Sequence, residues 1–191
     1  MYKQDVRTIG IDDGPFTFRN RSVVVVGVVV RGKSYIEGVL KGRATVDGSD
    51  ATEVLKRMIN GSRFVDQIRI VMLDGISLGG FNVIDMDDLA ETMGKPVISI
   101  TRDQPDEEKV RKALIKNFDD WEKRLELIER HHLVEVRTEY NPIYIKFCGI
   151  NEREAITAVK DSIIRGCIPE QIRLAHMIAS AFVLGESKGS A

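Results

Sequence analysis

A run of nine residues that is almost pure valine, Ser22–Val30, constrains the fold of this chain more than any other feature. Valine is branched at Cβ, which favours a strand over a helix. An unbroken apolar run, without polar residues at alternate positions, is typical of a strand that is covered on both faces. The run therefore predicts a sheet enclosed between two further layers, and not a sheet with one face in water.

Strands and helices are predicted on either side of this run from changes in the apolar period. Strands at 6–11, 22–30 and 34–40 are separated by short links, such as the turn at Arg31–Lys33, and form an antiparallel meander. Further strands are predicted over 68–73, 96–100 and 142–147, and helices over 51–59, 85–93, 105–130, 151–165 and 169–184. This order predicts one α/β domain over residues 1–191, a mixed sheet in which parallel strands follow the meander and helices cover both faces, with a frayed tail at 185–191.

Composition excludes several classes of protein. Apolar residues make up 43% and charged residues 30%, which rules out a wholly disordered chain, and 28 basic against 29 acidic residues rule out a strongly basic coat for nucleic acid. Charge is unevenly spread: residues 1–46 carry a net charge of +4 and residues 47–91 carry −5. This suits a site that binds a metal and an anion together, and ordinary scatter of surface charge gives the same pattern.

No apolar run approaches the roughly 20 residues that a bilayer crossing needs, and the N-terminal residues lack the apolar core of a signal peptide. Cys148 and Cys167 form no CxxC pair and no zinc-type spacing with histidine, so we expect reduced thiols in a cytoplasmic protein without membrane contact. The oligomeric state is left open.

Two aspartates mark a candidate metal site. Asp12 follows the first predicted strand and Asp74 follows the fourth, so the two carboxylates meet at one sheet edge if these strands are neighbours. Such a pair is a hard-oxygen site for Mg²⁺ or Mn²⁺. Asp-Gly after a strand is also common turn chemistry, and the Asp13–Pro15 run is even more typical of a turn.

One histidine is a candidate third member of this site. His176 borders the apolar stripe of the last predicted helix, where a histidine is usually packed or half-exposed. If that helix crosses the sheet edge, the imidazole joins the carboxylates as a ligand or a proton carrier. His131 and His132 end the predicted long helix, where they are solvated or interact with the helix dipole.

These motifs resemble, in chain order, those of endonuclease V, a family with a ribonuclease H-like fold that cuts DNA or RNA near deaminated bases with Mg²⁺. The similar stretches are Gly10–Asp12, Leu73–Gly75, Pro96–Arg102 and, as the most specific match, Arg165–His176. The whole pattern resembles an archaeal family of unassigned function, domain of unknown function 99, which is remotely similar to endonuclease V.

The sequence departs from the endonuclease V pattern in three places. The position of the catalytic glutamate is Ala44, and Asp47 or Asp50 is the candidate replacement. The endonuclease V family has a wedge that separates the nucleic-acid strands. Its prolines and phenylalanine are missing here, and only Tyr35 of the wedge remains. No His-Pro-Arg motif occurs within residues 76–82.

The resemblance implies a metal-dependent endonuclease acting on DNA or RNA. Asp12, Asp74 and His176 would form the catalytic and metal-binding group. Substrate contacts would come from phosphate-binding arginines, backbone-tracking lysine and arginine, and the remaining wedge residue: Arg102, Arg173, Lys33, Lys41, Arg43 and Tyr35. The alternatives are a non-catalytic module that binds nucleic acid or protein after losing the glutamate, and an unrelated metabolic enzyme on the same fold.

Overall fold

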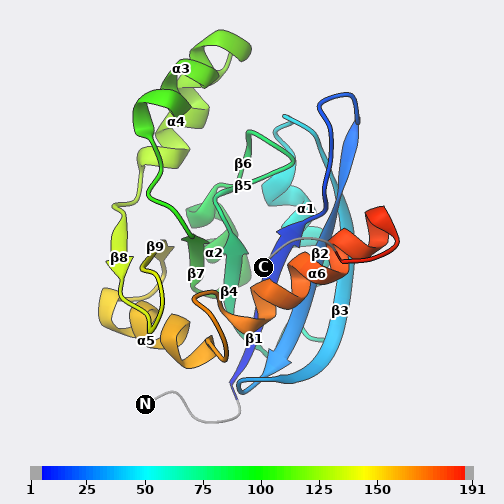
Figure 1. Ribbon diagram of the computed structural model, residues 1–191. Helices are drawn as coiled ribbons and strands as arrows, with labels where there is room; N and C mark the ends of the chain where they lie inside the picture. The colour runs from blue at the N-terminus through cyan, green and yellow to red at the C-terminus, as the bar shows by residue number, and fades with distance from the viewer. Residues whose placement is uncertain (1–5, 188–191) are drawn as a thin grey trace.

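A computed structural model describes residues 6–187, and its centre is a seven-stranded sheet (Figure 1). The sheet strands are β1 (Arg7–Asp13), β2 (Ser22–Arg31), β3 (Tyr35–Thr45), β4 (Ile68–Asp74), β7 (Val97–Thr101), β8 (Val134–Val136) and β9 (Ile143–Cys148). A separate hairpin pairs β5 (Ser77–Leu78) with β6 (Asn82–Val83).

The strand order is β3-β2-β1-β4-β7-β9-β8, and the sheet is mixed. Strands β1, β2 and β3 form the predicted antiparallel meander, and β1, β4 and β7 run parallel to one another. Strand β9 runs antiparallel to β7, and β8, which was not predicted, pairs antiparallel with β9. The ends of β1, β4 and β7 therefore meet at one edge of the sheet, where parallel strands commonly present functional groups.

Helices lie on both faces of this sheet, as predicted. They are α1 (Ala51–Asn60), α2 (Met86–Met93), α3 (Glu107–Asn117), α4 (Trp121–Glu129), α5 (Glu152–Ser162) and α6 (Glu170–Leu184). Helices α1 and α2 cover one face, α5 and α6 cover the other, and α3 and α4 extend from one end of the sheet (Figure 1).

The valines of β2 divide between the two faces. Val25 and Val29 belong to the core beneath α1 and α2, whereas Val26 and Val28 pack against Ala175 of α6. All five side chains are fully buried. The unbroken valine run therefore marks a strand covered on both sides, which is what the sequence predicts.

The prediction of one continuous helix over 105–130 was wrong, because the chain forms two helices there. Phe118 has an extended backbone between α3 and α4, and its ring packs against Phe81 and the guanidinium of Arg124. These contacts turn the ring toward the β5–β6 hairpin, which a continuous helix would not allow. Strand β3 also continues to Thr45, beyond the predicted end at residue 40.

The last helix ends as predicted at Leu184, where Gly185 takes the left-handed conformation of a helix C-cap. Of the predicted frayed tail, residues 188–191 lie outside the described part of the chain. None of the helices between residues 6 and 187 combines the length and the apolar character needed to cross a membrane.

Candidate functional site

Asp12, the penultimate residue of β1, and Asp74, the last residue of β4, lie on adjacent parallel strands and face the same side of the sheet. Ile11 of β1 is in register with Leu73 of β4, and both side chains join the core beneath α1 and α2. Side chains alternate between the faces of a strand, so the aspartates that follow point to the opposite face, which α6 covers. The predicted meeting of the two carboxylates at one sheet edge is thus present.

Helix α6 brings His176 to these carboxylates. The backbone of α6 comes so close to β1 that a Cβ atom on Gly10 would lie 2.5 Å from the backbone nitrogen of Ile172. His176 Nδ1 lies 2.8 Å from Asp12 Oδ2. Ligand atoms of Asp12, Asp74 and His176 all lie within 4.8 Å of one another, so the group is compact enough to share one ion.

Burial and mutual repulsion set the protonation of this group. Burial, and then the Asp12 carboxylate, raise the pKa of Asp74 to about 6, against the opposing effect of Arg102 and His176. The hydrogen bond with Asp12 raises the pKa of His176 above its usual range. Two close carboxylates and a histidine form a donor set that suits a hard divalent cation, whose charge offsets the repulsion between the acids.

Asp13 is a third acid at this edge that the sequence interpretation assigned to a turn. Burial, and then the Asp12 carboxylate, raise the pKa of Asp13 to about 7, and Asp74 raises it further. Its Oδ2 atom accepts a hydrogen bond of 3.1 Å from the backbone N–H of Gly79. The available signal was the Asp12–Asp13 pair, because adjacent acids at the end of a buried strand are unusual for a simple turn.

Arg102 follows β7, next to the end of β4. Its positive charge lowers the pKa of Asp74, so the guanidinium lies near that carboxylate. Its Nη2 atom is buried and has no hydrogen-bond partner among the described residues. A buried donor without a partner is costly, and this one is free to bind an anion beside the carboxylates.

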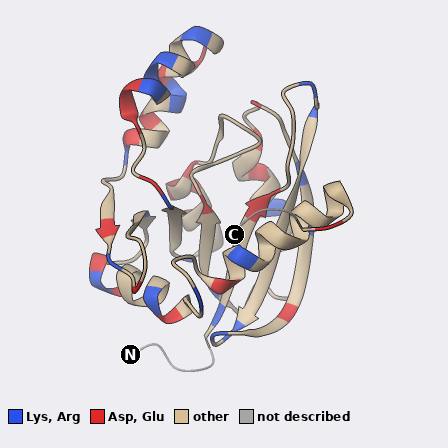
Figure 2. Cartoon of the chain, in the orientation of Figure 1, with Lys and Arg blue, Asp and Glu red and all other residues tan. Residues whose placement is uncertain are grey.

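Two predicted basic residues lie on the α6 face of β3. Lys41 pairs with Val26, which in turn pairs with Asp12, so Lys41 is level with the site and two strands away. Its Nζ atom lies 5.1 Å from the ring centre of Phe182 in α6. Arg43, two residues further along, points to the same face. Figure 2 shows the acidic end of β1 in red beside α6.

The other predicted substrate contacts are not brought to the site. Tyr35 pairs with Arg31, which pairs with Arg7 at the start of β1, so Tyr35 and the neighbouring Lys33 lie at the opposite end of the strands from Asp12. Arg173 donates two hydrogen bonds, of 2.6 and 2.8 Å, to the carboxylate of Glu170.

The two candidate replacements for the glutamate are engaged elsewhere. The Asp50 carboxylate accepts hydrogen bonds from Thr45 and Asn82, and that of Asp47 accepts one from the backbone of Phe81. Ala44 itself is buried beneath α1. Asp13 is close enough to raise the electrostatic cost of the Asp12–Asp74 pair, but it is not one of the residues whose ligand atoms lie within 4.8 Å of one another.

Comparison with known sequences identifies close relatives. The family model described as endonuclease dU matches residues 4–183. A UPF0215 protein of Methanothermobacter thermautotrophicus is 47% identical over 193 residues, which cover 99% of this chain and 93% of that protein. A UPF0215 protein of Methanosarcina acetivorans is 46% identical and covers 99% of this chain and 96% of its own length.

Solved structures share the fold. A protein of unknown function from Archaeoglobus fulgidus has a TM-score of 0.82 and 36% identity, over 93% of this chain and 98% of that one. Human ENDOV has a TM-score of 0.58 and 14% identity, over 91% and 82% of the two chains. Aquifex aeolicus Argonaute has a TM-score of 0.53 and 12% identity, over 90% of this chain and 28% of its own. The endonuclease V and Argonaute matches confirm the ribonuclease H-like architecture that the sequence predicts.

Proposed function

The chain belongs to the endonuclease dU family, and we propose that it is a Mg²⁺- or Mn²⁺-dependent endonuclease that cuts DNA at or near deoxyuridine. The observation that carries the proposal is the convergence of Asp12, Asp74 and His176 within 4.8 Å at one edge of the sheet. The description of the family supports deoxyuridine-containing DNA as the substrate. The two carboxylates and the histidine support metal-dependent cleavage of a phosphodiester bond. RNA and inosine-containing strands are the competing substrates that the experiment includes.

In this proposal Asp12 and Asp74 hold the metal and Asp13 adds negative charge beside them. A bound divalent cation supplies Lewis-acid stabilisation of the scissile phosphate and lowers the pKa of a bound water. His176 is oriented through Nδ1 by Asp12, which leaves its second ring nitrogen for a ligand bond or for proton transfer. The two metal-binding acids therefore differ in role, because Asp12 binds the ion and orients the histidine, whereas Asp74 only binds the ion.

Basic side chains around the carboxylates position the phosphates. The buried, unpartnered Nη2 atom of Arg102 suits a phosphate oxygen next to Asp74. Lys41 and Arg43 line the same face two strands away, where they track the DNA backbone without reading bases. Three basic groups beside a carboxylate cluster give the combination of cation and anion binding that phosphodiester cleavage requires.

A second candidate function is binding without cleavage, and the buried Ala44 in place of a glutamate favours it. In that case the fold and the basic face are retained for a nucleic-acid partner. The two functions differ in one measurable respect, because only the nuclease breaks the strand.

A cleavage panel tests the proposed function. Single- and double-stranded DNA containing one deoxyuridine, matched strands with inosine or thymidine, and RNA of the same sequence are incubated with Mg²⁺, Mn²⁺ or EDTA. We expect metal-dependent cleavage of the deoxyuridine strands and none in EDTA. Binding of every strand without cleavage would support the second function, and cleavage that persists in EDTA would contradict the metal site.

A further inference from the structure

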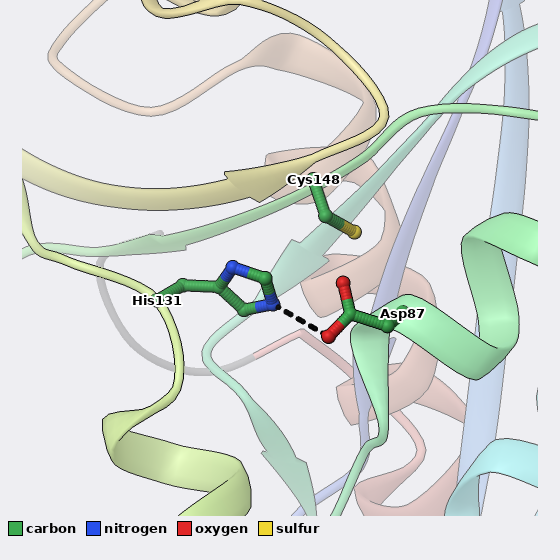
Figure 3. A group of neighbouring side chains, drawn as sticks. All are labelled: Asp87, His131 and Cys148. Carbon is green, nitrogen blue, oxygen red and sulfur yellow. Dashed lines mark ion pairs between the residues drawn. The ribbon is translucent and has the colours of Figure 1, made fainter.

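Asp87, His131 and Cys148 form a second group of metal-binding side chains, far from the first. Asp87 lies in the first turn of α2, His131 directly follows α4 and its cap Arg130, and Cys148 ends β9. Their ligand atoms all lie within 4.8 Å of one another. Figure 3 shows the sulfur, the carboxylate and the imidazole ring directed toward one space. Three separate segments of the chain thus supply one ligand each.

The histidine nitrogen and the thiol of this group are buried, and the histidine nitrogen is unpaired among the described residues. His131 Nε2 lies 3.2 Å from Asp87 Oδ2, without the geometry of a hydrogen bond, and it has no hydrogen-bond partner among the described residues. Cys148 is 8% exposed, and its thiol donates to the backbone oxygen of Met86 at 3.2 Å. Asp87 is half-exposed and contacts Arg130 as well as His131. A buried imidazole nitrogen aimed at a carboxylate and a thiol is the arrangement that a metal completes.

This group lies at the other end of the sheet from the first site. Cys148 pairs with Val97 at the start of β7, whereas Arg102 follows the end of the same strand. The two groups also lie on different faces, because Cys148 belongs to the core beneath α1 and α2 and His176 lies on α6. An ion at one group therefore makes no contact with the other.

We infer that Asp87, His131 and Cys148 bind a Zn²⁺ ion, with water in the fourth position. Sulfur, imidazole nitrogen and carboxylate oxygen are the zinc ligand set, whereas Mg²⁺ prefers oxygen alone. Tetrahedral zinc with its usual bond lengths separates ligand atoms by about 3.5 Å. The present spread of up to 4.8 Å closes to that value by rotation of the half-exposed Asp87 side chain and of His131, which lies outside any helix.

The ion would add to the contacts that already hold α4 against the rest of the fold, such as those of Arg124 with the backbone oxygens of Gly48 and Phe81. Helices α3 and α4 extend from the end of the sheet, and Arg130 already links the end of α4 to Asp85 and Asp87 of α2. Lys146 of β9 donates a hydrogen bond to the backbone oxygen of Ile128 in α4, and the Cys148 ligand would add a second tie between β9 and the end of α4. Because binding needs a thiolate, it releases the thiol proton and couples the metal to the folded arrangement of all three segments. The inferred role is to fix the α3–α4 pair against α2 and β9.

The test measures Zn²⁺ retention by the folded, chelator-treated chain after Zn²⁺ is added and excess removed. Variants Cys148→Ser and His131→Asn remove one ligand each, and Cys167→Ser and His132→Asn are matched controls, because Cys167 and His132 lie outside the group. An Asp74→Asn background removes any contribution from the first site. We expect one tightly held ion per chain, a higher melting temperature with Zn²⁺, and affinity at least about 10-fold weaker in both ligand variants only.

Substitution of Co²⁺ gives a second measurement, because a cobalt–thiolate bond absorbs in the near ultraviolet and that band must disappear in Cys148→Ser. Should that variant fail to fold, His131→Asn decides the question, since His131 is less buried than Cys148. No retained Zn²⁺ in the parent protein, or equal retention by ligand variants and controls, would overturn the inference. Neither result depends on cleavage of nucleic acid.

Discussion

At the scale of single residues, burial and mutual repulsion disfavour the charged forms of the acids at the ends of β1 and β4. The pKa of Asp13 is raised to about 7 and that of Asp74 to about 6, chiefly by burial and then by the Asp12 carboxylate. Folding therefore favours the protonated acids, and ionising them in the folded protein costs free energy. This cost of buried, neighbouring charges is the physical reason for expecting a cation at Asp12, and it has a measurable consequence in metal-free protein.

The metal-free protein should be less stable at pH 8 than at pH 5. The folded chain holds the Asp13 proton up to about pH 7, whereas the unfolded chain releases it near 3.8, so the folded state binds more protons between these values. The free energy of unfolding then falls as pH rises. His176 acts in the same direction, because a raised pKa gives stability that is lost as pH rises through that pKa. Urea unfolding in EDTA at several pH values measures the slope.

Asp13→Asn isolates the largest of these contributions. Asparagine keeps an acceptor for the Gly79 N–H and cannot ionise, so the variant should gain about 4 kcal/mol over the wild type at pH 8 and about 2 kcal/mol at pH 5. The exposed Asp66→Asn is the control and should change neither value by more than about 0.5 kcal/mol. A wild-type pH slope that persists unchanged in Asp13→Asn would contradict this assignment.

Residues at strand ends were predictable, and residues placed by register were not. Asp12 and Asp74 follow apolar strands, so their meeting requires only that the strands be parallel neighbours. Tyr35 and Lys41 both belong to β3. Antiparallel pairing with β2 places Tyr35, at the start of β3, at the opposite end of the strands from Asp12. The sequence interpretation missed Asp13 because the burial of its side chain depends on the β5–β6 hairpin. That hairpin has no clear sequence signal.

At the scale of elements, the packing of α6 on β1 positions His176. Gly10 lacks a side chain where the first turn of α6 crosses the strand, and a Cβ atom there would meet backbone atoms that cannot rotate away. The 2.8 Å contact between His176 and Asp12 depends on this approach. The close packing of α6 thus explains why the Gly10–Asp12 motif has glycine at its first position.

Gly10→Ala should push α6 away from β1. We expect a loss of about 3 kcal/mol in the free energy of unfolding, because overpacking against backbone forces the elements apart. Gly42→Ala, in β3, is the matched control, since its Cβ would lie no closer than 3.3 Å to a Val54 side chain, and it should cost less than about 1 kcal/mol. Equal losses in the two variants by urea unfolding would contradict the close approach of α6.

Elements with strong apolar periods were predicted well, and short or interrupted ones were not. Strand β2 and helix α2, with its Gly94 cap, follow directly from local sequence. The break between α3 and α4 depends on where the Phe118 ring packs, which is a tertiary contact. Strand β8 is only three residues long and exists through its pairing with β9. Local patterns carry no information on such contacts.

At the scale of the whole molecule, the sheet separates two chemically different groups. Oxygen and nitrogen ligands gather where β1 and β4 end, and a thiol, an imidazole and a carboxylate gather where β9 ends. The first set suits Mg²⁺ or Mn²⁺ and the second suits Zn²⁺. The near-zero net charge conceals this division, because the basic residues of β3 flank the acids of the first group.

The most direct test of the proposed metal site is the rate of Mg²⁺-dependent cleavage of a deoxyuridine-containing DNA strand by Asp74→Asn, compared with Asp66→Asn and the wild type. Asp74→Asn keeps the size of the side chain but removes a charge of the proposed metal site, so we expect a fall on the order of 10³-fold or more without loss of folding. Asp66→Asn should cleave at the wild-type rate. Wild-type cleavage by a folded Asp74→Asn protein would contradict the assignment of the site to Asp12, Asp74 and His176.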